Sequence, residues 1–403
     1  MSMSDPLPNQ SAQVSDVESA VAPLRRDDFD RDVWCLMGLA VDAADITRAV
    51  AAIDDAVRTR RKLSFVTPNV NFLARAMKDE GARRDILNAD LSLADGAPLV
   101  AMAKMLGVPL KSRVAGSDLF EALRRRPAFA GRPLKVFFFG GRPGAAEAAF
   151  SAINREKGGV EAVGWHNPGF GDVESMSSDE VLAKINATEP DFVMVALGAA
   201  KGQAWIERNK DRLTAPVTAH LGAVVDFTAG GVARAPVWVQ RSGFEWLWRI
   251  KEEPSLWRRY FSDGIALAGL ALTGLAPQLG KGRAPGGKAD AALTPAAGES
   301  IIRLSGVLGQ GALQPVREAF RAAAARGLPV RLDLAGATAV DCAFLGQVLM
   351  LEKHLAQRGA EISLTGANRR IGSLFRANRM NYARLADGEQ AVSQEPGLRK
   401  AAL

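Results

Sequence analysis

Residues 67–100 read TPNVNFLARAMKDEGARRDILNADLSLADGAPLV, and this stretch decides the fold of the chain. An apolar run at 63–66 precedes it and a second, Leu91–Ala94, lies inside it, with the apolar periodicity of a helix between the two. Each run ends in short polar residues, at Thr67 and at Asp95-Gly96. The pattern predicts a strand–helix–strand unit, and ligands bind outside the carboxyl ends of such strands. Taken alone, an Asp-Gly pair after a strand is more often a simple turn.

Further strands of the same kind follow along the chain. Leu134–Phe139 is a continuous apolar run, and a glycine-rich turn at 140–144 and an alanine-rich helix come after it. Such a turn places backbone N–H groups around a phosphate, although this one lacks the full dinucleotide fingerprint and the P-loop lysine. Asp191–Gly198 and His220–Phe227 have the character of two more buried strands. We therefore predict an α/β fold with a Rossmann-like parallel sheet over residues 31–230.

The beginning of the chain has a different composition. Residues 1–30 have few large apolar side chains, so we expect a disordered leader there. The basic-then-apolar order of a signal peptide is missing from the leader, which predicts a cytoplasmic protein. Val33–Ala40 is expected to be the first strand of the folded region.

Length and charge limit the classes of function. The 403 residues suffice for two domains with a core each, and the net charge of +7 favours anionic partners such as phosphates, nucleic acid or anionic lipid. Two distant cysteines and three scattered histidines form no disulfide framework or zinc motif. The Asp-x-Asp motifs at 28–30 and 30–32 lie in or beside the leader. We therefore expect no metal and no other cofactor.

Residues 231–279 form a distinct aromatic and basic tail. Its first part, to Tyr260, contains four tryptophans and six basic residues. Basic residues beside amphipathic aromatic residues are typical of an interfacial membrane helix, and a helix that packs its tryptophans into the core is an equal alternative. The apolar run at 265–279 is too short to span a bilayer.

Residues 280–298 are rich in Gly, Ala, Pro and Lys and are expected to be a flexible linker that leaves the flanking domains separable. Strand and helix patterns then alternate over residues 299–390, which predicts a second, small α/β domain.

Three motifs, TPNVNFL, ADGAPLV and RVAGSDLF at 113–120, resemble the WecG/TagA/CpsF family of bacterial glycosyltransferases in sequence and in order. The resemblance runs from about Trp34 to Tyr260. It implies transfer of a sugar from a UDP-linked donor to a lipid-pyrophosphate-linked saccharide of the undecaprenyl type, at the inner face of the cytoplasmic membrane. Such a reaction belongs to bacterial surface or exopolysaccharide synthesis and would invert the anomeric carbon.

The resemblance also assigns site residues. Asp95 lies at the position of the family's proposed catalytic base, and Thr67 and Asn69 lie in its active-site polar turn. His166 by itself would more often be structural than catalytic. Substrate contacts are expected at Asn71, Gly96, Arg113, Gly140, Gly141, His166, Gly198, Gln203, Asp226, Arg234, Arg249, Arg258 and Arg259.

One stretch departs from the family pattern. The family follows the strand at 191–198 with Gly-x-Pro-x-Gln-Glu-x-Trp, whereas this chain reads GAAKGQAW at 198–205. Gly202 therefore replaces a glutamine that is thought to contact substrate, and Gln203 could serve from the next position. The departure leaves open a different donor, or an inactive transferase-like scaffold that acts through its C-terminal domain. A nicotinamide dehydrogenase is a more distant alternative, because no acidic residue is suitably placed beyond Gly144.

The second domain resembles a STAS domain, a partner-binding module, around Val330–Leu334 and the VDCAFLG motif at 340–346. The STAS signature has Ser or Thr after its aspartate, but Cys342 and Ala343 stand there, so we expect no phosphorylation switch. Expected partners are a nucleotide-sugar, a lipid-linked saccharide, the membrane face, a protein bound by the STAS-like domain and a second copy of the chain, without nucleic acid.

Overall fold

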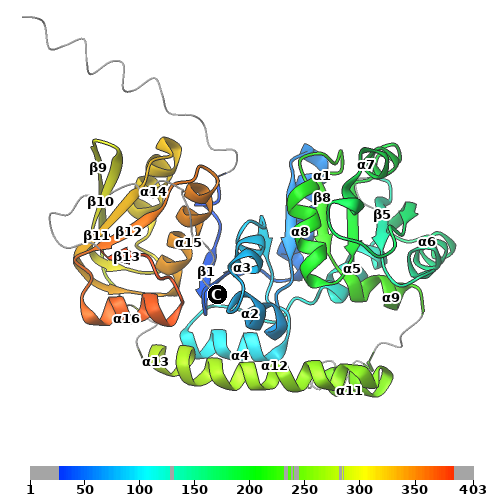
Figure 1. Cartoon of the computed structure of the whole chain (residues 1–403), viewed down its shortest axis with the longest axis horizontal. Helices are drawn as coiled ribbons and strands as arrows, with labels where there is room; N and C mark the ends of the chain where they lie inside the picture. The colour runs from blue at the N-terminus through cyan, green and yellow to red at the C-terminus, as the bar shows by residue number, and fades with distance from the viewer. Residues whose placement is uncertain are drawn as a thin grey trace, which may run out of the picture.

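The computed structural model describes residues 27–127, 131–230, 235–236, 239, 245–280, 284 and 286–384. Two α/β units lie at opposite ends of the molecule, and a helical arm runs along one side of both (Figure 1).

The first unit is built on a parallel sheet, as the sequence predicts. Its six strands within the described residues have the order β4-β3-β8-β7-β5-β6, and all neighbours are parallel. Most of their side chains are buried, because helices cover both faces and leave no face to water. The strands are β3 (Leu63–Val66), β4 (Leu91–Ser92), β5 (Leu134–Gly140), β6 (Val160–His166), β7 (Phe192–Ala196) and β8 (Val217–His220).

The helices of this unit alternate with its strands. They are α1 (Ile46–Thr59), α2 (Val70–Ala76), α3 (Glu80–Leu87), α4 (Ala97–Leu106), α5 (Gly116–Arg125), α6 (Ala145–Glu156), α7 (Asp179–Asn186), α8 (Ala199–Asn209) and α9 (Gly222–Thr228). The prediction of a strand over His220–Phe227 is wrong, because β8 ends at His220 and α9 begins two residues later. Val224 and Val225 are buried, as expected for a strand, but they lie on helix α9.

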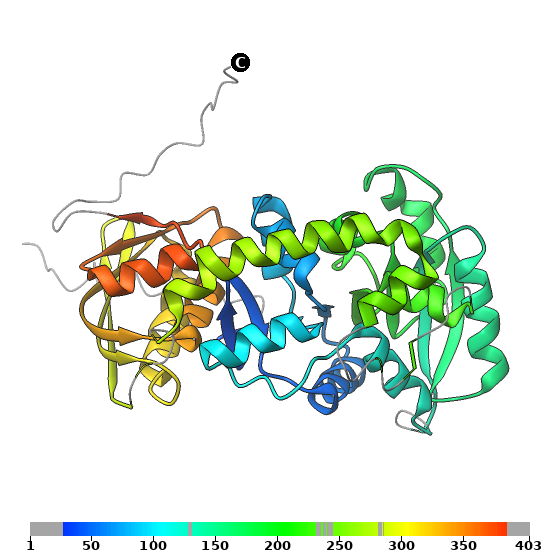
Figure 2. The same cartoon turned by 90° about the horizontal axis from the view of Figure 1, so that it is seen from below.

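The tail forms the arm. It comprises α11 (Glu245–Glu252), α12 (Trp257–Leu270), a π-helical turn (Ala271–Leu275) and α13 (Ala276–Gln278), and it reaches from the first unit to the second (Figure 2). Trp246 and Trp257 are 42% and 52% exposed, so the alternative in which the tail buries its tryptophans in the core is wrong for these two. None of the helices in the described ranges has the length and apolar character needed to cross a membrane.

The second unit is a mixed sheet with the strand order β13-β12-β11-β10-β9. Its strands are β9 (Ala289–Ala296), β10 (Glu299–Leu308), β11 (Val330–Val340), β12 (Ile362–Thr365) and β13 (Ala383–Arg384). Its helices are α14 (Gln314–Arg326), α15 (Cys342–Ala356) and α16 (Arg369–Ala377).

Part of the expected linker belongs to this sheet. β9 pairs antiparallel with β10 from Ala289 to Ala296, so the prediction of a linker up to residue 298 is wrong. Backbone hydrogen bonds hold an edge strand in place without large side chains, and Ala291 and Leu293 still pack against the core.

The segment before the first helix packs against the second unit. β1 (Val33–Leu36) and β2 (Leu39–Asp42) form a hairpin around Met37 and Gly38, whose φ angles are 55° and 87°. The prediction of one strand over Val33–Ala40 is therefore wrong. A Cβ on Gly346 of α15 would lie 2.3 Å from the carbonyl oxygen of Val33, so only glycine allows β1 to cross α15 this closely.

Buried ion pairs reinforce this contact. Asp28 accepts from Arg31 at 2.9 Å and forms an ion pair with Lys353 at 2.8 Å, while Glu352 of α15 forms a bidentate pair with Arg83 of α3. Phe29 is fully buried, so the expected leader at 1–30 does not extend to residues 27–30, and residues 1–26 lie outside the described ranges. One hydrophobic cluster runs through both units, beside two further clusters that pack around the parallel sheet, so the prediction that the units are joined only by a flexible linker is wrong.

Candidate functional site

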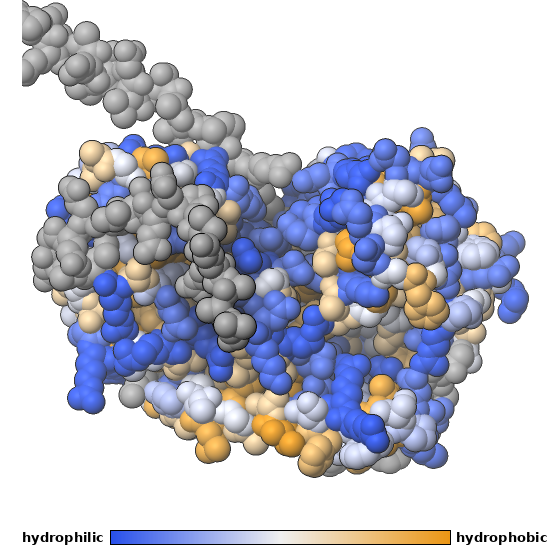
Figure 3. All heavy atoms as spheres, in the orientation of Figure 1, coloured by the Kyte–Doolittle hydropathy of each residue, from blue (hydrophilic) through white to orange (hydrophobic). Residues whose placement is uncertain are grey.

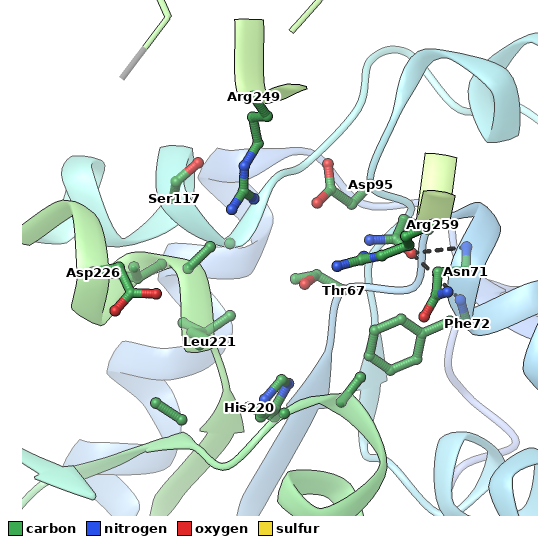
Figure 4. A pocket seen from close by; sticks show the side chains of 18 of the residues that line it. Thr67, Asn71, Phe72, Asp95, Ser117, His220, Leu221, Asp226, Arg249 and Arg259 are labelled. Atoms are coloured by element: carbon green, nitrogen blue, oxygen red, sulfur yellow. Dashed lines mark hydrogen bonds between the residues drawn. The ribbon is translucent and has the colours of Figure 1, made fainter. Parts of the chain in front are cut away.

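A cavity of about 920 Å³ lies where the strands of the parallel sheet end. Its walls come from the segments after β3, β4, β5, β7 and β8 on one side and from α11 and α12 of the tail on the other. Thr67, Asp95, Asp226, Arg249 and Arg259 converge on this space from separate segments (Figure 4). The strand-end position predicted for the site therefore coincides with this cavity.

Asp95 and Arg113 form the charged centre of the cavity. A nitrogen of the Arg113 guanidinium lies 3.8 Å from Oδ1 of Asp95, and the same side chain reaches Asp118 at 3.5 Å and Glu245 at 3.0 Å. One arginine thus faces three carboxylates, which come from the end of β4, from α5 and from the tail helix α11.

Burial is the main influence on the carboxyl group of Asp95. It raises the pKa of Asp95 to about 7, against the lowering effect of Arg113, and the negative charges of Glu245 and Asp118 raise it further. A carboxylate with a pKa near neutrality is a competent general base, because it accepts a proton readily at the pH of the reaction.

The polar turn after β3 contributes structure as well as contacts. Oδ1 of Asn69 accepts from the backbone N–H groups of Asn71 at 3.0 Å and Phe72 at 3.3 Å, so Asn69 is the N-cap of α2. Asn71 donates from Nδ2 to Asp263 of α12 at 3.0 Å. Thr67 lines the cavity beside Gly116.

Several helices begin at the cavity without a side-chain cap, among them α4, α5 and α8. The N-caps of α4, α5 and α8 are Gly96, Ala115 and Gly198, and none of these accepts the first N–H groups of its helix. Side chains cap α1, α3 and α7, which begin elsewhere, and Asn69 caps α2 at the cavity itself. Uncapped helix N-termini carry partial positive charge and bind anions, so the cavity is suited to phosphate groups.

Polar contacts join the tail to this site. Glu245 pairs with Arg113, Asp263 with Asn71, and Glu253 with Arg142 of the glycine-rich turn after β5. Arg142 also lies 3.9 Å from Asp226, whose pKa is raised by burial. The tail therefore closes the cavity with residues that lie far from its other walls in sequence.

The structure brings together most of the residues expected at the site. Those that line the cavity are Thr67, Asn69, Asn71, Asp95, Gly96, Arg113, Gly141, Gly198, Asp226, Arg249 and Arg259.

The others lie outside it. Gly140 ends β5 against the backbone of Ala196, and Arg258 lies over the ring of Trp257 on the outer face of α12. His166 stacks on Phe139 with its Nδ1 3.3 Å from Nζ of Lys184. Arg234 lies outside the described residues.

Gln203 also faces away from the cavity. Its side chain is 3% exposed and its Nε2 donates to the backbone oxygen of Asp85 at 3.2 Å, on the opposite side of α8. It is therefore not placed to substitute for the family glutamine from the next position.

His220 is a cavity residue that the sequence did not indicate. A Cβ on Gly202 would lie 2.1 Å from Cδ2 of His220, so the histidine ring lies against Gly202, where the family has its glutamine. Burial lowers the pKa of His220 to about 4, and Nε2 of its neutral ring has no hydrogen-bond partner among the described residues. The sequence alone could not identify this histidine as a cavity residue. Residue 220 ends a strand and residue 202 lies on a helix, and only the folded chain brings the two together.

Arginine and lysine side chains bring positive charge to the site. Arg113, Arg142, Lys201, Arg249 and Arg259 line the cavity. In the part of the chain that the structure describes, no three histidine, cysteine or acidic side chains gather in a way that could hold a metal ion.

Comparison with known proteins found similar transferases and two matching family models. The N-acetylglucosaminyldiphosphoundecaprenol N-acetyl-beta-D-mannosaminyltransferase of Bacillus spizizenii is 30% identical over 220 residues, which cover 54% of this chain and 83% of that protein. The enzyme of the same name from Bacillus subtilis is 29% identical over 201 residues, or 50% of this chain and 75% of that protein. A model of the STAS domain (MlaB) matches residues 292–385, and that of the glycosyl transferase WecG/TagA/CpsF family matches residues 34–279. The chain therefore belongs to the WecG/TagA/CpsF family of glycosyltransferases and carries a STAS domain after its transferase region.

Proposed function

We propose that this glycosyltransferase moves a sugar from a nucleotide diphosphate donor, expected to be UDP-linked, to a saccharide on a lipid pyrophosphate. The names of the two Bacillus relatives suggest the class of both substrates. An N-acetylhexosamine is the transferred sugar, and N-acetylglucosaminyl diphosphoundecaprenol or a close analogue is the acceptor.

In the proposed reaction, a hydroxyl oxygen of the acceptor attacks the anomeric carbon of the donor sugar on the face opposite the diphosphate. The new carbon–oxygen bond forms as the bond from the anomeric carbon to the phosphate oxygen breaks, which inverts the configuration. Asp95 takes the hydroxyl proton, and the bond's electron pair leaves on the diphosphate.

The remaining cavity residues stabilise the leaving group. Arg113 and the uncapped N-termini of α5 and α8 supply positive charge and N–H donors where negative charge develops on the diphosphate. The single observation that carries the proposal is this convergence: a half-buried carboxylate of raised pKa, an arginine and uncapped helix N-termini face one cavity.

The tail supports a peripheral position on the membrane that holds such an acceptor. From residue 257 onward the arm exposes five large apolar side chains, and their sequence spacing of four or seven residues places them on one face of a helix. We name this set the apolar stripe: Trp257, Phe261, Ile265, Leu272 and Leu279. An amphipathic helix of this kind binds in the plane of the membrane interface.

The test is release of UDP by purified protein, with UDP-N-acetylhexosamines as donors and a short-chain polyprenyl diphosphate-GlcNAc as acceptor. Asp95→Asn should lower kcat by about 100-fold or more, because the general base is lost while the side-chain shape is kept. Asp85→Asn is the matched control, since Asp85 also has a raised pKa but lies outside the cavity. It should behave as the wild type does.

An inactive scaffold would give the opposite result. The wild type would release no UDP with any donor of the panel, although it would bind nucleotide-sugar or partner proteins. Equal turnover by wild type and Asp95→Asn would remove Asp95 from the mechanism without removing the family's activity.

A further inference from the structure

The end of the arm that carries the apolar stripe packs against the STAS domain. α13 packs against α16, and Asn378, just after α16, donates from Nδ2 to Oε1 of Gln278 at 2.8 Å with both side chains buried. Seen from below, α16 lies beside the end of the arm on the same face of the molecule (Figure 2). The two helices are therefore parts of one surface that two domains build.

α16 brings basic side chains to that surface. Ile371, Leu374 and Phe375 are buried against the sheet, and arginines occupy the outward positions. The exposed members of this set are Arg369, Arg370, Arg376 and, one turn further, Arg379.

The same surface carries almost no negative charge. Between Trp257 and Leu279 the one acidic residue is Asp263, which is buried and accepts from Asn71, and residues 369–379 contain none. Hydrophilic side chains lie below α16 and a hydrophobic ridge lies below the arm (Figure 3). A row of arginines beside exposed apolar side chains is complementary to anionic headgroups above an acyl layer.

The chemistry of α16 fits a lipid surface better than a protein partner. The STAS motif VDCAFLG leads into a different helix, α15. The β1–β2 hairpin of the same chain covers α15, and Cys342 at its start is buried. α16 exposes arginines without large apolar side chains, and protein interfaces depend on buried apolar or aromatic anchors at their centre.

We propose that α16 of the STAS domain is a second membrane-contacting element, whose arginines bind the phosphate-bearing headgroups of an anionic bilayer while the apolar stripe enters the interface. The inference rests on the proposed membrane position of the tail and extends it to the second domain. It gives the STAS domain a role in orienting the transferase cavity against the membrane.

Vesicle co-sedimentation tests this proposal with the full chain. Phosphatidylcholine vesicles with and without phosphatidylglycerol would be compared for the wild type and for Arg369→Ser/Arg370→Ser/Arg376→Ser. The variant should bind anionic vesicles at least about tenfold more weakly, because each basic residue near an anionic surface strengthens binding. UDP release with a water-soluble acceptor should not change.

Arg58→Ser/Arg61→Ser/Arg155→Ser is the matched control, since it removes the same charge from exposed positions at α1 and α6 and should bind as the wild type does. If the α16 variant also binds as the wild type does, α16 makes no membrane contact, although the apolar stripe can still do so. Equal weakening by the control would show a general effect of net charge and would overturn the proposal. A wild type that binds neither vesicle would overturn both membrane proposals and leave the transferase proposal standing.

Discussion

At the residue scale, the neighbours of Asp95 predict how the reaction depends on pH. Burial raises the pKa of Asp95 to about 7, and the charge of Glu245 contributes to this rise. A general base must be deprotonated, so kcat/KM should increase with pH through about 7 and level off above it. Glu245→Gln removes a negative charge that raises the pKa, so its profile should move to lower pH.

Steady-state UDP release between about pH 5 and pH 9 measures both profiles. Glu252→Gln is the control, because Glu252 lies exposed on the same helix α11. A Glu245→Gln profile that coincides with those of the wild type and the control would contradict the electrostatic account of the site.

The contact between Gly202 and His220 makes a second prediction at this scale. Gly202→Gln restores the family residue but places its Cβ on the ring of His220, 2.1 Å from Cδ2. We expect the free energy of unfolding to fall by about 1–3 kcal/mol, as in other overpacked interiors. Gly202→Gln/His220→Ala should recover most of this loss, because the ring is removed.

Urea denaturation of the two variants and of His220→Ala alone completes a double-mutant cycle. Additive effects would mean that the two positions do not compete for space. The KM for the donor, measured in parallel, reports whether the restored glutamine contacts substrate.

Several of the predicted site residues that line the cavity share one property. Thr67, Asp95 and Gly198 each follow an apolar strand, and parallel strands bring their carboxyl ends to one edge. Glu245 and His220 could not be found in this way, because their place depends on how the tail docks and on a side-chain contact across two elements.

At the element scale, the close crossing of β1 over α15 predicts a strong effect at Gly346. A Cβ there would lie 2.3 Å from the carbonyl oxygen of Val33, and backbone cannot move aside as a flexible side chain can. Gly346→Ala should therefore lower the free energy of unfolding by about 1–3 kcal/mol. The same substitution at an open helical position should instead be neutral or stabilise by up to about 1 kcal/mol.

Gly269 of α12 provides that open position, because a methyl group added there would have no neighbouring atom within 4 Å. Chemical denaturation of Gly346→Ala and Gly269→Ala measures the difference. If both variants are as stable as the wild type, the hairpin does not pack on α15 as described.

Elements with long apolar runs were predictable, and those that depend on tertiary contacts were not. β5 and β7 follow from continuous buried runs. The short apolar run of α9 is compatible with a strand as well as with a helix, so its type could not be predicted. The small residues of β9 have the composition of a linker, so this strand was missed. Met37 in the β1–β2 turn has a positive φ angle, and a methionine at this position does not predict such a turn.

At the scale of the whole molecule, the shared core predicts that the transferase region does not fold well by itself. Ending the chain at residue 286 removes α15. The buried side chains of Phe29 and Trp34 then become exposed, and Arg83 loses its hydrogen-bonded partner Glu352. We expect such a fragment to aggregate or to unfold without cooperativity, and to release little UDP. Size-exclusion chromatography, circular dichroism and the UDP assay measure these outcomes.

Co-expression of residues 287–403 as a separate chain is the matched control, and it should restore a soluble complex with activity. A monomeric, cooperatively folded fragment with the wild-type rate would show that the shared core is dispensable. The sequence predicted both domains correctly but not their attachment, because linker composition carries no information about a hairpin that packs elsewhere.

The place of the β1–β2 hairpin also affects how the protein is made. The hairpin leaves the ribosome early, but α15, on which it packs, is synthesised some three hundred residues later. At about 5–20 residues per second, this leaves the apolar surface of the nascent hairpin uncovered for roughly 15–60 seconds. During that interval the hairpin is a natural binding site for chaperones, and we expect ribosome-bound chains that stop before α15 to be retained by them.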